Sequence, residues 1–280
     1  MGERIEQSAF WDDRADAWTR EADDLEAFAG QFSDPAIELL DPRPGEHVAD
    51  VGCGPGITTV ALARRVAPGG TATGVDVAPR MVEAANARAR ASGLDNVSFV
   101  LGDPGAGPIG SFDAVFSRFG VMFFDDPPVA FANLASSLRP GGRFVAVAWG
   151  ELGSNPWMSL PTMFAAGPLQ AEINPPGPDE PGPFSLADPA KTSALLGSSG
   201  FEDVTVTRRE GAWTADAATI EGALARVMAV GPLGAAWAGA DESARAVAMA
   251  AVRDGLEEHR HGDGWRVPAV ALVISASVAP

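Results

Sequence analysis

Apolar residues recur along the chain with two spacings, one typical of amphipathic helices and the other of buried strands. In the N-terminal segment, a stripe at helical spacing from Trp11 to Leu25 predicts a helix over residues 8–28. Short apolar runs predict strands over residues 48–51, 71–77, 97–102, 112–118, 143–149, 201–209 and 265–278. Helical patterns lie between many of these runs, at 57–67, 79–92 and 188–199. The alternation of strand and helix predicts an α/β protein with a mostly parallel sheet.

The first predicted strand runs into a glycine-rich turn. Gly52, Gly54 and Gly56 stand at alternate positions between the apolar run and the next predicted helix. A junction of strand, turn and helix lets a ligand approach bare backbone amides at the helix N-terminus. Glycine suits these positions because a Cβ would block either the turn or the ligand.

The glycine spacing and two acidic residues narrow the class of ligand. A dinucleotide-binding turn reads G-x-G-x-x-G, whereas the third glycine here comes one residue early. Asp50, two residues before the first glycine, is badly placed beside a pyrophosphate and well placed beside an ammonium group. Asp76 closes the next strand, where a carboxylate can bind ribose hydroxyls. A nucleoside with a zwitterionic tail and no phosphate fits best, which indicates S-adenosylmethionine.

Several segments together resemble the class I S-adenosylmethionine-dependent methyltransferases. Residues 47–56 resemble motif I of that family, and later segments match it in order: GVD at 74–76, LGD at 101–103, SFDAVFSRFGVMFF at 111–124 and LRPGGRFVAVAW at 138–149. The chain is most similar to the subgroup related to ubiquinone and menaquinone biosynthesis, whose members act mostly on small molecules. The core resemblance covers about residues 40–213. It implies a doubly wound, seven-stranded sheet of order 3-2-1-4-5-7-6 with an antiparallel last strand.

The resemblance also implies a set of cofactor-binding residues. Asp103 would accept a hydrogen bond from the adenine amino group, and Met81 would offer the adenine an apolar face. The backbone of Ser117 and Arg118 would contact the methionine end. The full expected set is Asp50, Gly52, Gly54, Gly56, Asp76, Val77, Met81, Gly102, Asp103, Ser117 and Arg118. The structural alternatives are a turn role for Asp103 and plain helix–sheet packing for Met81.

Insertions around this core predict helical caps. We expect an N-terminal helical lid at 1–40 with a separate short helix at 35–41, a cofactor-binding core at 41–213 with a flap at 150–187, a helical cap at 214–262 and a final core strand at 263–280. We expect the lid and both insertions to roof the pocket together. On this view, Trp11, Trp18, Trp149 and Trp157 are lid or acceptor-binding residues; the alternative for the N-terminal stripe is packing on the core.

Composition restricts the partners of the protein. The 280 residues include 20 basic and 37 acidic side chains, a formal net charge of −17, which opposes binding to nucleic acid and to anionic membranes. Cys53 is the only cysteine, which excludes an intramolecular disulfide and a thiolate cluster, and we expect no metal. The polar N-terminus and the lack of a membrane-length apolar run predict a cytoplasmic protein, either a monomer or a homodimer.

Taken together, these patterns predict methyl transfer to a small apolar or aromatic molecule, driven mainly by proximity. General bases are scarce, because the chain has three histidines, one lysine and no tyrosine. Arg118 and His259 are the candidate catalytic residues; their structural alternatives are an ion pair beneath the flap for Arg118 and a solvated helix end for His259. Two other functions stay open: a methyltransferase-like protein that binds the cofactor as a scaffold or for a non-methylating reaction, and an NAD(P)-dependent oxidoreductase.

Overall fold

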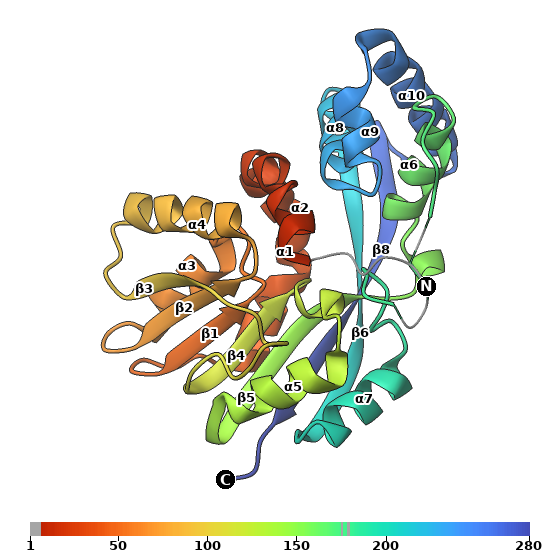
Figure 1. The fold of residues 1–280 in the computed structure, drawn as a ribbon. Helices are drawn as coiled ribbons and strands as arrows, with labels where there is room; N and C mark the ends of the chain where they lie inside the picture. The colour runs from red at the N-terminus through yellow and green to blue at the C-terminus, as the bar shows by residue number, and fades with distance from the viewer. Residues whose placement is uncertain (1–6, 175, 178–179) are drawn as a thin grey trace.

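The structure, a computed structural model, describes residues 7–174, 176–177 and 180–280 and centres on one twisted sheet (Figure 1). Its strands are β1 (His47–Val51), β2 (Thr71–Asp76), β3 (Val97–Leu101), β4 (Phe112–Arg118), β5 (Leu138–Trp149), β6 (Glu202–Asp216), β7 (Arg260–His261) and β8 (Gly264–Ser277). The order is β3-β2-β1-β4-β5-β8-β6, with the short β7 paired to β8. The strands from β1 to β5 are parallel, and β8 is antiparallel to both β5 and β6. The predicted sheet order, with β8 as its last strand, is confirmed.

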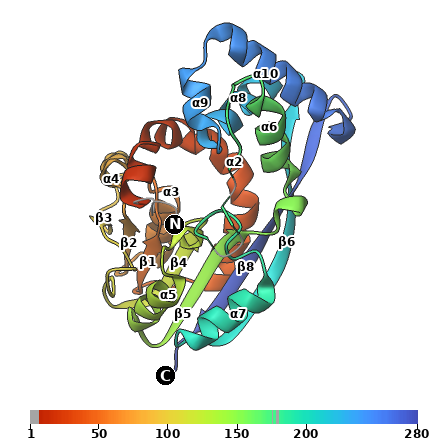
Figure 2. The same ribbon diagram turned by 45° about the vertical axis from the view of Figure 1, so that its right-hand side comes forward.

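Helices cover both faces of the sheet, as Figures 1 and 2 show. One face carries α2 (Ala15–Leu40), α3 (Ile57–Val66) and α4 (Pro79–Ser92), and the other carries α5 (Pro127–Ser136) and α7 (Pro189–Ser198). Helix ends follow local signals: Gly93 ends α4 with a φ of 68°, and the Asp126 carboxylate accepts a hydrogen bond from the Val129 amide at the start of α5. Residues 104–111 form no helix, as their Gly and Pro content predicts.

The N-terminal segment differs from its predicted form. After the short α1 (Gln7–Asp12), α2 runs as one helix to Leu40 with Pro35 inside it, so the separate helix predicted at 35–41 is wrong. Phe32, on the amino side of Pro35, and Ile37 and Leu40 beyond it are all buried in the main core. Their burial outweighs the one backbone hydrogen bond that proline cannot donate. The second half of α2 is therefore part of the core.

The two insertions form a separate helical cap at one end of the sheet. The cap contains α6 (Pro156–Ala166), α8 (Ile220–Val230), α9 (Gly234–Gly239) and α10 (Glu242–Gly255), with the 3₁₀ turns η2 (Leu152–Ser154) and η3 (Glu257–His259) nearby. Long β6 and β8 extend beyond the parallel strands into this cap (Figures 1 and 2). A second hydrophobic core, which includes Leu224, Val252 and Trp265, holds the cap on those strand extensions.

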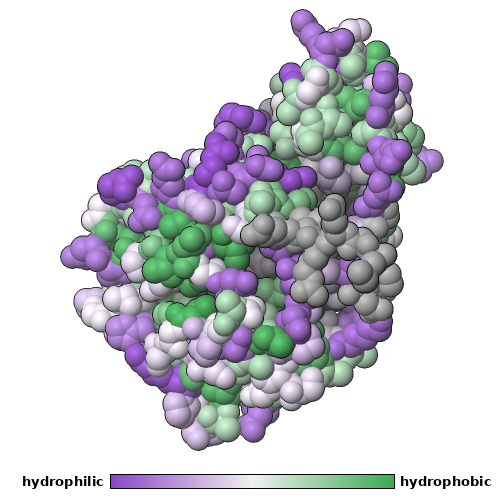
Figure 3. All heavy atoms as spheres, viewed as in Figure 1, coloured by the Kyte–Doolittle hydropathy of each residue, from purple (hydrophilic) through white to green (hydrophobic). Residues whose placement is uncertain are grey.

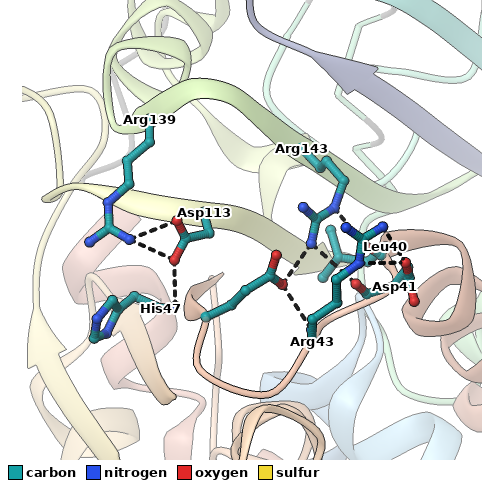
Figure 4. A network of polar contacts seen from close by, with 8 residues as sticks. Leu40, Asp41, Arg43, His47, Asp113, Arg139 and Arg143 are labelled. Carbon is teal, nitrogen blue, oxygen red and sulfur yellow. Dashed lines mark hydrogen bonds and ion pairs between the residues drawn. The ribbon is translucent and has the colours of Figure 1, made fainter. Parts of the chain in front are cut away.

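A network of ion pairs lies at the amino ends of the parallel strands (Figure 4). Arg139 contacts both carboxylate oxygens of Asp113, which also accepts a hydrogen bond from the His47 amide at 2.7 Å. Arg143 donates to the backbone carbonyls of Leu40 and Asp41. These contacts tie the turn before β1 to β4 and β5, and they account for His47 as a structural residue.

The surface is mixed in character. Figure 3 shows hydrophilic side chains over much of the outline, and hydrophobic side chains gathered where α4 and β3 lie. Val100 and Leu101, on the edge strand β3, are exposed, Leu101 by 59%. Among the described helices, none is both long and apolar enough to span a bilayer.

Candidate functional site

A pocket of about 850 Å³ opens at the carboxyl ends of the parallel strands, the edge where doubly wound sheets bind ligands. The turn after β1 forms its floor, the ends of β2, β3 and β4 form its sides, and α1 with the first half of α2 covers it. The lining residues are Gln7, Ser8, Trp11, Trp18, Ala22, Leu25, Glu26, Ala29, Val51–Pro55, Ile57, Thr58, Val75–Val77, Met81, Leu101–Gly105, Arg118–Gly120, Phe123–Asp126 and Val129.

The glycine turn is built for close approach of backbone. Gly52, Gly54 and Gly56 have φ values of 66°, 51° and 84°, in the left-handed region that favours glycine. A Cβ on Gly52 would come within 2.7 Å of the Gly120 Cα, so the turns after β1 and β4 pack backbone to backbone. A Cβ on Gly54 would meet no protein atom within 4 Å. Gly54 therefore presents open backbone to the pocket.

Asp50 lies fully buried beneath this turn. Its Oδ2 accepts hydrogen bonds from the hydroxyls of Thr58 and Thr59 at 2.6 and 2.7 Å, whereas its Oδ1 has no partner among the described residues. Burial raises the pKa of Asp50 to about 6, although the two hydroxyls and nearby Arg118 act in the opposite direction. An unpartnered carboxylate oxygen at this depth favours a cationic ligand group.

Asp76 braces the same turn from β2. Its Oδ2 accepts a hydrogen bond from the Gly54 amide at 2.8 Å, and its Oδ1 accepts one from the Ala78 amide at 3.0 Å. Burial raises the pKa of Asp76, and these amide hydrogen bonds oppose that shift. Each oxygen keeps a second lone pair, so Asp76 can hold the turn and still accept a hydrogen bond from a hydroxyl.

Cys53 also lines the pocket but lacks the environment of a nucleophile. Burial, followed by the nearby charges of Asp76 and Asp50, raises the pKa of its thiol well above the ordinary value. A reactive cysteine needs a lowered pKa and a positive environment. Cys53 is a small buried residue of the turn.

The helical cover is held to the pocket rim by aromatic and polar contacts. Trp11 packs edge-on against Phe123 and Trp18, with ring centroids 4.8 and 6.1 Å apart. The Ser8 hydroxyl donates to the Val77 carbonyl at 2.8 Å. The indole N–H of Trp18 is buried and has no acceptor among the described residues. A buried donor on a pocket residue requires an acceptor, which a bound polar molecule can supply.

An ion pair crosses the pocket from its cover to its base. Arg118, at the end of β4, donates from Nη1 to both carboxylate oxygens of Glu26 in α2, at 2.8 and 2.7 Å. The Arg118 and Glu26 side chains are 16% and 31% exposed. The same Nη1 lies 3.3 Å from the Ser33 hydroxyl. Arg118 therefore forms an ion pair, as its structural alternative predicts, but with Glu26 of α2 and not beneath the flap, and it also lines the pocket.

Most of the predicted cofactor residues meet at this pocket. Those that line it are Gly52, Gly54, Asp76, Val77, Met81, Gly102, Asp103 and Arg118. Three lie beneath the lining: Asp50, Gly56 and Ser117, whose hydroxyl donates to the Val51 carbonyl at 2.8 Å. Met81 lines the pocket and packs with Trp11 and Trp18 of the first two helices, and its expected contact with adenine stays a prediction.

The other predicted site residues lie elsewhere. Trp149 and Trp157 do not line the pocket but pack against Phe28, Trp149 by stacking and Trp157 edge-on. His259 lies in η3, outside the pocket lining. Among the described residues, none after Val129 lines the pocket, so the expectation that both insertions roof it is wrong. The flap instead runs beside η1 (Val121–Phe123), where the Ser185 hydroxyl donates to the Met122 carbonyl at 2.7 Å.

The sequence patterns did not identify Glu26 or Phe119. Glu26 follows Trp18 and Ala22 at intervals of four residues, so an acidic residue inside an apolar stripe was the available signal. Phe119 has a φ of 58° and stacks on Trp149 with ring centroids 3.9 Å apart. A non-glycine residue in this region marks a turn held by its surroundings, and nothing local in the sequence announces it.

Comparison with known proteins shows what the segment that forms the floor of the pocket is similar to. Residues 48–142 match the family model described as a methyltransferase domain. Nocamycin O-methyltransferase of Saccharothrix syringae is 40% identical over 169 residues, which cover 59% of this chain and 57% of the relative. Aklanonic acid methyltransferase DauC of Streptomyces sp. (strain C5) is 38% identical over 110 residues, 38% of this chain and 50% of the relative. The chain spans about half the length of these curated relatives.

Solved structures share the fold over almost the whole chain. A SAM-dependent methyltransferase from Aquifex aeolicus aligns with a TM-score of 0.53 at 16% identity and covers 93% of this chain and 97% of its own. Three features indicate the same fold: the matched methyltransferase domain, the sheet order and the glycine turn between β1 and α3. Residues 48–142 therefore form a methyltransferase domain, and the chain as a whole shares the fold of the solved methyltransferase.

Proposed function

We propose that this protein transfers a methyl group from S-adenosylmethionine to a small molecule. The observation that carries the proposal is the pocket at the carboxyl edge of the sheet, where Gly54 offers open backbone between buried Asp50 and Asp76. The matches to nocamycin O-methyltransferase and aklanonic acid methyltransferase support a small-molecule acceptor.

The residues of the pocket suit this cofactor. Asp50, with its unpartnered oxygen, lies where a cationic amino group would be stabilised, and Asp76 would accept hydrogen bonds from ribose hydroxyls. Asp103 and Met81 would hold the adenine. These assignments remain proposals for each residue. When bound, the cofactor supplies a methyl group on a positively charged sulfur, which is the electrophile of the reaction.

The protein's own contribution is alignment and exclusion of water. Trp11, Trp18 and Phe123 form an apolar cover over the pocket. Such a cover holds two reactants in line and removes competing water. The acceptor would enter between this cover and the end of β4, near Arg118 and Phe119.

The comparisons favour neither of the alternative functions. A direct test is calorimetric titration with S-adenosylmethionine, S-adenosylhomocysteine and NADH, followed by assay for S-adenosylhomocysteine after incubation with candidate acceptors. We expect the first two ligands to bind and NADH not to bind. Binding of NADH alone would overturn the proposal.

The Asp76→Ala variant tests whether the titrated ligand binds in this pocket. It should bind S-adenosylhomocysteine at least about tenfold more weakly, because hydrogen bonds to a charged group contribute about 1.5–3 kcal/mol. Asp188→Ala, which removes a carboxylate that caps α7 away from the pocket, is the matched control. Equal affinity in the two variants would remove the ribose assignment.

A further inference from the structure

One charged residue of the pocket lining, Arg118, has N–H groups that donate to no described residue. The lining includes five carboxylates, and each already accepts a hydrogen bond from the protein: Glu26 from Arg118, Asp76 from Gly54 and Ala78, Asp103 from Gly105, Asp125 from Gln7 and Asp126 from Val129. Arg118 is the single cation among the described lining residues. Each lining carboxylate therefore already accepts a hydrogen bond from the protein. For Arg118, the hydrogen bonds of each guanidinium nitrogen have to be considered in turn.

Only one nitrogen of the Arg118 guanidinium is engaged. Nη1 makes all of its contacts with Glu26 and Ser33, and no described residue accepts a hydrogen bond from Nε or Nη2. These two nitrogens carry three N–H donors. They lie side by side in the planar guanidinium, an arrangement that matches the two oxygens of a carboxylate.

We propose that Arg118 binds an oxyanion on the methyl acceptor, specifically a carboxylate, and that Glu26 positions the guanidinium for it. This inference rests on the proposed function and names the substrate class of the same pocket. Glu26 contacts the guanidinium from α2 through Nη1 alone, and Arg118 itself lines the pocket. The contact across the pocket thus fixes the orientation of Arg118 without using its remaining donors.

A carboxylate acceptor also explains why the pocket needs no strong base. His47 lies at the amino end of β1, His259 lies in η3 and His261 lies in β7. No histidine therefore lines the pocket. An ionised carboxylate is already a nucleophile. One of its oxygens forms the new bond to the methyl carbon, the sulfur–methyl bond breaks, and the electron pair stays on sulfur. The products are a methyl ester and a neutral thioether, and no proton moves.

The test compares two matched probes on the complex of the protein with S-adenosylhomocysteine. Naphthalene-2-carboxylate and its neutral counterpart naphthalene-2-carboxamide have nearly the same shape and differ in charge. Calorimetric titration should show at least about tenfold tighter binding of the carboxylate, the scale of one charge-assisted contact. In Arg118→Met this preference should disappear, while Arg118→Lys should keep part of it.

Glu26→Gln separates positioning from charge. The glutamine carbonyl can still accept from Nη1, and the competing negative charge is gone, so the carboxylate should bind more tightly than in the wild type. Glu221→Gln, which removes the carboxylate paired with Arg253 on the cap, controls for the change in net charge in Glu26→Gln, and Arg253→Gln controls for the change in Arg118→Met. Thermal melting confirms that each variant is folded.

The outcomes separate this inference from the proposed function. Failure of the wild type to bind S-adenosylhomocysteine would remove the proposed function itself. If the cofactor product binds but the two probes bind equally, or neither binds, the assignment of a carboxylate acceptor is overturned. It is also overturned if Arg118→Met weakens S-adenosylhomocysteine but not 5′-methylthioadenosine, because Arg118 would then bind the carboxylate of the cofactor.

Discussion

At the scale of single residues, the pocket depends on a carboxylate that the fold buries completely. Asp50 lies between β2 and β4, opposite Gly74 and Phe116, and receives only two hydroxyl hydrogen bonds. Its pKa of about 6, against an ordinary 3.8, is the consequence of burial. The folded chain therefore keeps a proton on Asp50 over a range of pH in which the unfolded chain has lost it.

This difference makes stability depend on pH. Because the folded-state pKa of Asp50 is raised, its contribution is fully present below about pH 4 and is lost as the pH rises to about 6. The loss of stability is about 3 kcal/mol, because the pKa of Asp50 is about 6 in the folded chain and 3.8 ordinarily. Urea unfolding of the wild type and Asp50→Asn across this range should show the two free energies of unfolding diverging. Parallel curves would contradict the raised pKa.

Two glycines in the turn should respond differently when changed to alanine, one mainly in stability and the other mainly in ligand binding. Gly52→Ala forces a Cβ against the backbone of Gly120 and should lower the free energy of unfolding by about 3 kcal/mol, from a left-handed φ and an overpacked contact. Gly54→Ala has only the φ penalty, about 1 kcal/mol, but its Cβ enters the pocket.

Melting temperature and affinity for S-adenosylhomocysteine, measured on both variants, check this contrast. Gly54→Ala should remain folded and lose at least about tenfold in affinity, a change of about 1.4 kcal/mol. Normal binding by Gly54→Ala would show that the ligand does not pass over this residue.

At the scale of elements, the first helices act as a cover docked by few contacts. Trp11 contributes ring contacts with Phe123 and Trp18, each worth about 0.5–1.5 kcal/mol beyond burial. Arg80 ties the same cover to α4 through Asp16. This salt bridge is exposed and contributes little. The aromatic contacts hold α1 over the pocket together with the hydrogen bonds of Ser8 to Val77 and of the Arg80 amide to Asp12.

Trp11→Ala should release the cover without unfolding the sheet. We expect dissociation of S-adenosylhomocysteine to become about tenfold faster, as two aromatic contacts correspond to about 1–3 kcal/mol. Stopped-flow displacement measures this rate. Trp237→Ala is the matched control, because Trp237 lies in α9 outside the pocket lining. Equal dissociation rates in the two variants would contradict the role of the cover.

At the scale of the whole molecule, two hydrophobic cores divide the chain. One joins the sheet to its flanking helices, and the other holds the cap on the extended ends of β6 and β8. The pocket lining draws on the first core and on two smaller clusters, one with Met81, Trp11 and Trp18 and one with Cys53, and on no residue of the core that holds the cap. Damage to the cap should therefore be separable from damage to ligand binding.

Gly255→Ala tests this separation. A Cβ on Gly255 would collide with the Phe164 ring across α10 and α6, and overpacking of this kind costs about 1–3 kcal/mol. We expect a lower melting temperature with unchanged affinity for S-adenosylhomocysteine. Gly239→Ala, in the same cap, meets no atom within 4 Å and should melt as the wild type does. A loss of affinity in Gly255→Ala would couple the cap to the pocket.

The amino-acid sequence alone determined where strands and helices lie along the chain and which turn forms the floor of the pocket, whereas the expected strand order came from the family resemblance. Apolar runs and glycine, proline and aspartate signals act between residues close in the chain, so Gly93 and Asp126 mark helix ends wherever the helices pack. The same holds for the turn from Asp50 to Gly56, whose backbone needs glycine locally.

Only the tertiary structure decided which distant segments cover that floor. Trp11, Trp149 and Trp157 were equivalent as aromatic residues in the sequence, but packing brings Trp11 to the pocket and places the other two against Phe28. The pairing of Glu26 with Arg118, 92 positions away, likewise appears only when α2 crosses the end of β4. Burial and ion pairing depend on residues that are distant in the sequence and become neighbours only in the folded chain, so the local sequence pattern does not predict them.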